Sequence, residues 1–143
     1  MVCDDLVSNM DMMPTTLELC GLPDAGTGEG LDGRSLLPAL RGDPFRDRQE
    51  RLLLEFHGIR YLYSERAIFT ADGWKCVFNP TDTDEVYHLT TDSAEMTNLV
   101  GSSAHAETIE RLRRELMGAV VEVRDPIRGA VYKLLDHWDE PWA

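Results

Sequence analysis

The stretch RAIFTADGWKCVFN, residues 66–79, is the strongest indication of the fold that we predict for this chain. Two short runs rich in apolar and aromatic residues, RAIFTA (66–71) and GWKCVFN (73–79), flank the turn residues Asp72 and Gly73. This pattern is typical of a β-hairpin, because Gly readily adopts the positive φ that tight turns need. The stretch therefore predicts two antiparallel strands that are neighbours in one sheet.

Two more strands and a helix are predicted around this hairpin. RLLLEFHG (51–58) precedes it and DEVYHL (84–89) follows it, which suggests an antiparallel meander. A helix is expected to begin near Ser102 or Ser103 and to end before Pro126. Its apolar positions fall on one stripe: Ile109, Leu112, Leu116, Val120 and Val123. The predicted fold class is α+β, a small four-stranded antiparallel sheet packed by a C-terminal helix.

The residues before this sheet predict helices and no strand. MDMMPTTLELCGL (10–22) reads as a short helix with Asp11 as its N-cap and Gly21 just after its end. LDGRSLLPALRG (31–42) supplies a turn and a second short helical piece. These segments do not belong to the predicted sheet in any obvious way, so we expect them to come from another domain.

The composition restricts the classes of function. Of the 143 residues, 26 are acidic and 14 basic, which gives a net charge of −12 at pH 7. This charge argues against binding to nucleic acid or to an anionic membrane surface, because both are bound through clustered Lys and Arg. No run approaches the roughly 20 apolar residues of a membrane span. MVCDDLVSN (1–9) lacks the basic and apolar regions of a signal peptide, so we expect a cytoplasmic protein.

Four blocks of sequence, in order, resemble the late part of the sulfatases, in the alkaline phosphatase superfamily. They are LVSNMDMMPTTLELCGLP (6–23), LDGRSLLPALRG (31–42), ERAIFTADGWKCVFNP (65–80) and DEVYHLTTDSAEMTNL (84–99). The family versions read roughly vDlaPTlldlaG, DGrSLlPlL, RairtdryKyi and dELYDLenDPgEltNL. Three positions depart from the usual Tyr, Asp and Pro of the family: Cys76, His88 and Ser93.

This resemblance implies a domain organisation. Residues 1–42 would be the trailing fragment of the large α/β sulfatase domain, which is helical here. Residues 43–125 would be the C-terminal sulfatase subdomain, and residues 126–143 a helical or extended tail. The chain would then be the C-terminal part of a sulfuric ester hydrolase.

The chemistry of sulfatases needs residues that this chain lacks. The resemblance implies a formylglycine nucleophile, matured in a C-x-P-x-R or S-x-P-x-R motif, and a divalent cation, usually calcium. None of Cys3, Cys20 and Cys76 begins such a motif, and no Ser does. VCDDL (2–6) resembles the metal-binding aDDlG of the family, but it stands directly before the PT helix and reads as an acidic turn. We therefore expect no catalytic residue, metal site or cofactor in this chain, calcium only in the missing catalytic part, and no activity of the chain alone.

Four side chains near the first predicted strands are candidates for substrate binding, because the corresponding loop of sulfatases often lies near the substrate cleft. They are Glu55, His57, Arg60 and Arg66. A His and an Arg there could bind a sugar hydroxyl or carboxylate. The alternative is structural: His57 as a polar residue at a strand end, and Arg66 in an ion pair with Glu65 or Asp72. His88 and His105 are read as surface residues, and Lys75 as lying along the ring of Trp74.

The apolar residues of the predicted N-terminal helices indicate a missing partner. Met13, Leu17 and Cys20 would face the large domain, together with Leu36, Leu37 and Leu40. We expect the chain to bind a sulfatase catalytic domain or to form a homo-oligomer, because exposed apolar stripes are unusual on soluble monomers. A free-standing binding or assembly module, or a partner subunit derived from a sulfatase, is the alternative. The sequence does not indicate which sulfate ester would be cleaved.

Overall fold

The computed structural model describes residues 5–22, 30–43, 49–58, 64–80 and 82–126. The chain divides into two compact units, an N-terminal unit of residues 1–52 and a C-terminal unit of residues 53–143. The predicted boundaries after residues 42 and 125 remain predictions, and the predicted tail after Pro126 lies outside the described residues. Among the helices of the described ranges, none combines the length and the apolar character that crossing a membrane would require.

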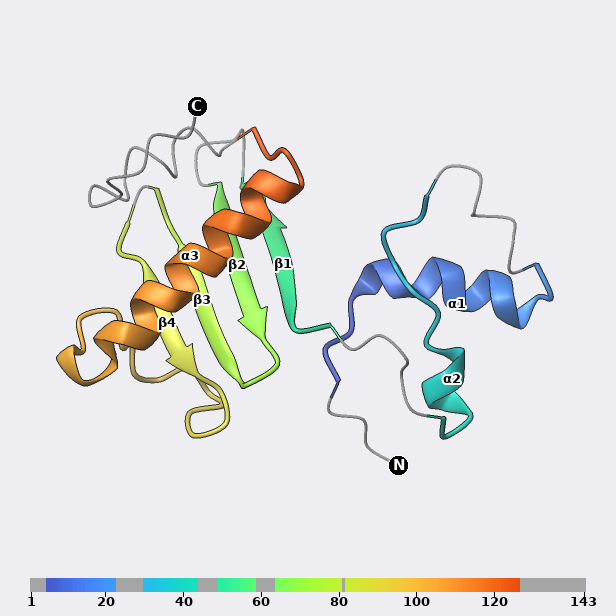
Figure 1. Cartoon of the computed structure of the whole chain (residues 1–143), viewed down its shortest axis with the longest axis horizontal. Coiled ribbons are helices and arrows are strands. Elements are labelled where there is room, and N and C mark those ends of the chain that lie inside the picture. Colours follow the sequence, from blue (N-terminus) through green and yellow to red (C-terminus); the bar gives the residue numbers. More distant parts are fainter. Residues whose placement is uncertain (1–4, 23–29, 44–48, 59–63, 81, 127–143) are drawn as a thin grey trace. The chain divides into compact units, whose positions relative to one another are not determined.

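The N-terminal unit contains helices α1 (Met12–Leu19) and α2 (Leu37–Leu40) (Figure 1). A 3-10 turn (Asn9–Asp11) leads into α1, and its N-cap is Ser8, whose hydroxyl accepts a hydrogen bond from the amide of Met10. The carboxylate of Asp11 accepts the amide of Ser8 at 2.8 Å, which completes a capping box. Asp11 directly precedes α1, as predicted, but its side chain makes no capping hydrogen bond to that helix and accepts the amide of Ser8 instead.

The end of α1 follows the prediction. Gly21 has a φ of +74°, and its amide donates to the carbonyl of Glu18. The amide of Leu22 donates to the carbonyl of Leu17, five residues back. This pair of bonds is the Schellman motif, in which Gly supplies the left-handed conformation that ends the helix.

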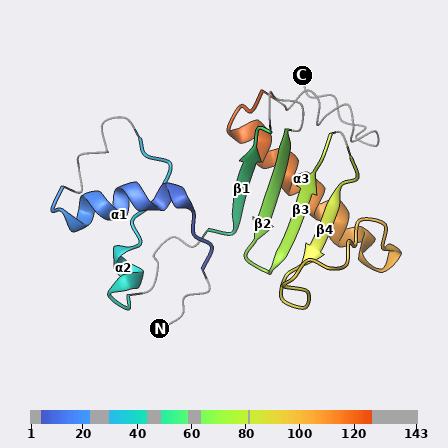
Figure 2. The ribbon, with the colours of Figure 1, turned by 180° about the vertical axis from the view of Figure 1, so that it is seen from behind.

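The C-terminal unit is a four-stranded sheet in the order β1-β2-β3-β4, with α3 across one face (Figure 1). Its elements are β1 (Arg51–Phe56), β2 (Glu65–Thr70), β3 (Trp74–Phe78), β4 (Glu85–His88) and α3 (Ala106–Glu122). Strands β2, β3 and β4 pair antiparallel in sequence order. Figure 2 shows the sheet from the face opposite α3. The predicted α+β class is confirmed.

The core lies between the sheet and α3. Ile68, Cys76 and Val86 are opposite one another in three neighbouring strands and are buried against the helix. The predicted helical stripe supplies the other side, with Ile109, Leu112, Leu116 and Val120 all buried. Val123 does not continue this stripe and is 54% exposed, because it follows the last helical residue.

The predicted hairpin is present between β2 and β3. Gly73 has a φ of +85°, as expected, and its amide donates to the carbonyl of Thr70 at 2.9 Å. The carbonyl of Gly73 accepts the amide of Leu89, so the hairpin turn is also tied to the end of β4. A Cβ atom at Gly73 would lie closer than 3.0 Å to Oγ1 of Thr90. Gly is therefore needed at this position both for its φ and for its lack of a side chain.

Three aromatic side chains meet on the helix-facing side of β3 and β4. The ring of His88 stacks on Trp74 with centroids 4.4 Å apart, and His105 lies against the same indole at 5.6 Å. Both histidines are half-buried, so they are not the surface residues that the sequence suggested. Trp74 and His88 are opposite each other in the β3–β4 register, which brings their rings together.

Lys75 lies on the other face of the sheet. Its Nζ is 2.5 Å from the carboxylate of Glu95 and 5.5 Å from the ring centroid of Phe69. The predicted contact with Trp74 is therefore wrong, because successive residues of a strand point to opposite faces.

Candidate substrate-binding site

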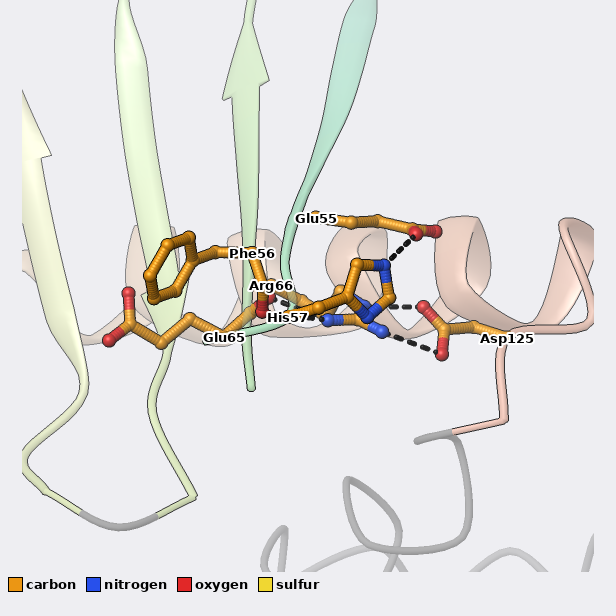
Figure 3. Close-up of polar contacts among 6 residues, drawn as sticks. All are labelled: Glu55, Phe56, His57, Glu65, Arg66 and Asp125. Carbon is orange, nitrogen blue, oxygen red and sulfur yellow. Dashed lines mark hydrogen bonds and ion pairs between the residues drawn. The ribbon is translucent and has the colours of Figure 1, made fainter. Parts of the chain in front are cut away.

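The four candidate residues belong to the β1–β2 part of the C-terminal unit. Glu55 is in β1, His57 follows the last residue of that strand, and Arg66 is the second residue of β2. Arg60 lies outside the described residues. The structure thus brings three of the four side chains to one end of neighbouring strands (Figure 3).

Glu55 and His57 form an accessible polar pair. Nε2 of His57 is 3.1 Å from Oε2 of Glu55, and the two side chains are 54% and 39% exposed. They meet because residues two apart in an extended chain point to the same side. Gly58 follows with a φ of +59°, which turns the chain immediately after the pair. Between them, the carboxylate and the imidazole can accept and donate hydrogen bonds to a ligand such as a hydroxyl group.

Arg66 is buried rather than accessible. Its Nε and Nη2 atoms donate to the two carboxylate oxygens of Asp125, the second bond measuring 3.0 Å, and Nη1 donates to backbone carbonyls (Figure 3). The side chains of Arg66 and Asp125 are only 2% and 0% exposed. Such a bidentate arrangement satisfies most of the guanidinium donors, as a buried charge requires.

The acidic partner of Arg66 is not one that the sequence suggested. Of the expected partners, Glu65 contributes its backbone carbonyl, at 2.8 Å, and Asp72 pairs instead with Arg111 at 2.8 Å. Asp125 is 59 residues from Arg66 in sequence. Nothing in the sequence distinguishes this aspartate from the other acids, so only the fold identifies it.

The end of α3 places Asp125 at this position. The amide of Asp125 donates to the carbonyl of Val120, and the amide of Arg124 donates to that of Val121, both at 3.0 Å. These are the two bonds of a second Schellman motif, with Arg124 at a φ of +55° where Gly is usual. The helix end therefore turns back and directs the carboxylate of Asp125 into the core.

The first two sulfatase-like blocks are joined by a buried polar network in the N-terminal unit. Asp11 is fully buried, and its Oδ1 accepts the amide of Arg34 at 2.9 Å. The hydroxyl of Thr15 accepts the amide of Leu36 at 2.9 Å. The guanidinium of Arg34 donates to the carbonyl of Leu6, also at 2.9 Å. The Asp and Thr of the first block thus bind the backbone of the second, which gives these residues a structural role.

The last sulfatase-like block is likewise organised by polar side chains. The carboxylate of Asp92 accepts the amides of Met96 and Thr97, and Oδ1 of Asn98 accepts the amide of Val86 at 3.0 Å. Nδ2 of Asn98 donates to the carbonyl of Asp84 at 3.0 Å. Asn98 therefore connects this loop to β4, so the block stabilises the subdomain rather than forming a reactive site.

Of the two described thiols, Cys20 is exposed and Cys76 is buried. Within the described ranges, no three His, Cys, Asp or Glu side chains come together as a metal site. The clustered oxygen ligands that calcium needs are thus not found among the described residues. Burial raises the pKa of the Cys76 thiol to about 12, which keeps this thiol protonated and unreactive at neutral pH.

Comparison with known proteins agrees with the resemblance to the late part of the sulfatases. Residues 1–123 match the family described as N-sulphoglucosamine sulphohydrolase, C-terminal. The chain is 30% identical over 92 residues to the choline-sulfatase of Rhizobium meliloti, covering 64% of this chain and 17% of that protein. It is 27% identical over 139 residues to the uncharacterized sulfatase YidJ of Escherichia coli, covering 97% of this chain and 26% of that protein.

Solved structures show the same fold. A 2-O GAG sulfatase matches with a TM-score of 0.77 and 21% identity, over 90% of this chain and 28% of that one. The chain thus spans between 17% and 28% of the length of these three proteins. Because the family match extends over residues 1–123, this chain belongs to the N-sulphoglucosamine sulphohydrolase C-terminal family.

Proposed function

We propose that this chain completes a sulfatase by binding a catalytic domain that carries the nucleophile and the metal ligands, and that it does not hydrolyse sulfate esters alone. The sequence supports the second part, since none of its Cys or Ser residues begins a C-x-P-x-R or S-x-P-x-R motif. The contribution of this chain would be the C-terminal subdomain, with Glu55 and His57 near the bound substrate. There they would bind a sugar hydroxyl or carboxylate of the sulfate ester.

The observation that carries this proposal is the exposed apolar surface of the N-terminal unit. On α1, Met12, Met13 and Leu19 are 62%, 57% and 61% exposed, and Leu40 on α2 is 64% exposed. Burying the exposed part of each side chain would contribute about 1–2 kcal/mol. The polar network of Asp11 and Thr15 meanwhile fixes the backbone of this unit. A pre-formed unit with large apolar side chains on its surface is suited to packing against another domain.

The test is complementation of a truncated sulfatase. A catalytic domain from a relative, ending before its own PT helix, is co-expressed with this chain and assayed on an aryl sulfate with calcium present. We expect no turnover with either part alone and turnover with both. Sulfatase activity of the purified chain alone, or no complex with the catalytic domain, would overturn the proposal.

Matched variants locate the binding surface. Met13→Asp with Leu40→Asp should abolish the complex, because both charges would be buried at the interface. Met96→Asp is the control, since Met96 is 80% exposed and lies in the C-terminal unit. The alternative partner for this surface is a second copy of the chain. Light scattering that gives a dimer in place of the 16.2 kDa monomer, disrupted by Met13→Asp and unaffected by the catalytic domain, would favour the homo-oligomer.

A further inference from the structure

The side chain of Arg66 bonds to the backbone at the end of β1 and at the start of β2. Nη1 of Arg66 donates to the carbonyl of Phe56, the last residue of β1, at 3.4 Å. The same atom donates to the carbonyl of Glu65, the first residue of β2, at 2.8 Å. Glu55 and His57 are the chain neighbours of Phe56. The position of this guanidinium therefore influences where the β1 end (Glu55, Phe56 and His57) lies relative to β2.

The guanidinium is itself held in place by Asp125. Two N–H groups of Arg66 meet the two carboxylate oxygens, which fixes the plane of the guanidinium as well as its distance. Asp125 is fixed in turn by the bond from its amide to Val120 at the end of α3. A continuous set of contacts thus links the helix end, through two buried side chains, to the backbone of the β1 end.

We propose that Asp125 and Arg66 are positioning residues for Glu55 and His57. Asp125 orients Arg66, and Arg66 holds the backbone of Phe56, so that the two exposed side chains are presented in one arrangement. Arg66 then acts from the core and does not touch the ligand. The positioning role of Asp125 and Arg66 is inferred from their hydrogen bonds alone. The role of Glu55 and His57 in binding a sulfated sugar rests on the proposed function.

A pair of variants separates positioning from stability. Removing one partner of a buried ion pair leaves an unpaired charge and strongly destabilises the fold, so single truncations do not separate positioning from stability. Replacing both partners by apolar residues of similar size often preserves stability. Arg66→Met with Asp125→Leu therefore retains a packed core, but leaves no N–H group to donate to the carbonyls of Phe56 and Glu65.

The experiment compares amide exchange in the full chain between the segment Arg51–Gly58 and strand β3. In the Arg66→Met, Asp125→Leu variant we expect at least about tenfold faster exchange in Arg51–Gly58, with β3 unchanged. The NMR signal of the His57 imidazole should also shift. The control is Glu110→Leu, which removes an exposed ion pair at 3.2 Å within α3 and should change neither segment. Exchange at the wild-type rate in Arg51–Gly58, or acceleration equal to that of β3, would overturn the positioning role.

A second readout uses the reconstituted enzyme with a sulfated monosaccharide as substrate. The double variant should raise KM by about tenfold and change kcat less than about twofold, because it alters binding and not the nucleophile. An unchanged KM together with faster exchange would overturn the substrate role of the β1 end. If the wild-type complex has no activity, the proposed function fails, while the exchange experiment still decides whether Asp125 and Arg66 position the β1 end.

Discussion

Replacing Gly73 by Ala tests the hairpin on which the predicted fold depends. Ala at a φ of +85° has to adopt a left-handed conformation, which costs about 1–2 kcal/mol. The new Cβ atom would also lie closer than 3.0 Å to Oγ1 of Thr90, and moving that side chain adds about 1 kcal/mol. We therefore expect Gly73→Ala to destabilise the C-terminal unit by about 2–3 kcal/mol.

The free energy of opening of this unit can be measured from the amide exchange rates of Cys76 and Val77 in β3. If stability falls by about 2–3 kcal/mol, these rates should rise roughly 30- to 150-fold. Adding Thr90→Ala should recover the part due to the collision, about 1 kcal/mol, and leave the backbone part. Gly118→Ala is the matched control, because Gly118 lies in α3 with open space around it and Ala should stabilise a helix by about 0.5–1 kcal/mol. Equal effects of the two Gly→Ala changes would refute this reasoning.

Four further predictions concern other parts of the chain. Arg124→Gly should raise the stability of the C-terminal unit by roughly 0.5–1 kcal/mol in urea unfolding, since Arg124 has a φ of +55°; a loss of stability would contradict this. Thr15→Val should leave the amide of Leu36 without its acceptor, at a cost of about 1–3 kcal/mol, and speed its exchange selectively. A thiol reagent at pH 8 should label the exposed Cys20 and spare Cys76 until the chain unfolds. Burial raises the pKa of Cys76 from 9.0 to about 12, so between these pH values the thiol ionises in the unfolded chain but not in the folded one. Stability should therefore fall as pH rises from 9.0 to about 12, by at most about 1.4 kcal/mol per pH unit.

The helices and strands and their order could be predicted from the sequence. The four strands, the helix after them and the two short N-terminal helices were predicted from apolar periodicity and from turn residues, and the resemblance to sulfatases came from four ordered blocks. Gly21 and Gly73 were assigned correctly because the conformation at a helix end or a hairpin depends on a few neighbouring residues. Helix ends and hairpin turns depend on residues that are close in sequence, so the sequence alone is enough to predict them.

Which side chains meet could be seen only in the folded chain. Arg66 was proposed as a ligand for substrate or as the partner of a nearby acid, yet its carboxylate partner is Asp125, beyond the end of α3. Asp11 was predicted to cap α1, yet its carboxylate accepts the amides of Ser8 and of Arg34, the latter 23 residues away. In each case several polar groups of the same type were available in the sequence. The choice among them depends on which one the packed helices and strands bring within hydrogen-bonding distance and remove from water, because a buried charge is stable only beside its partner.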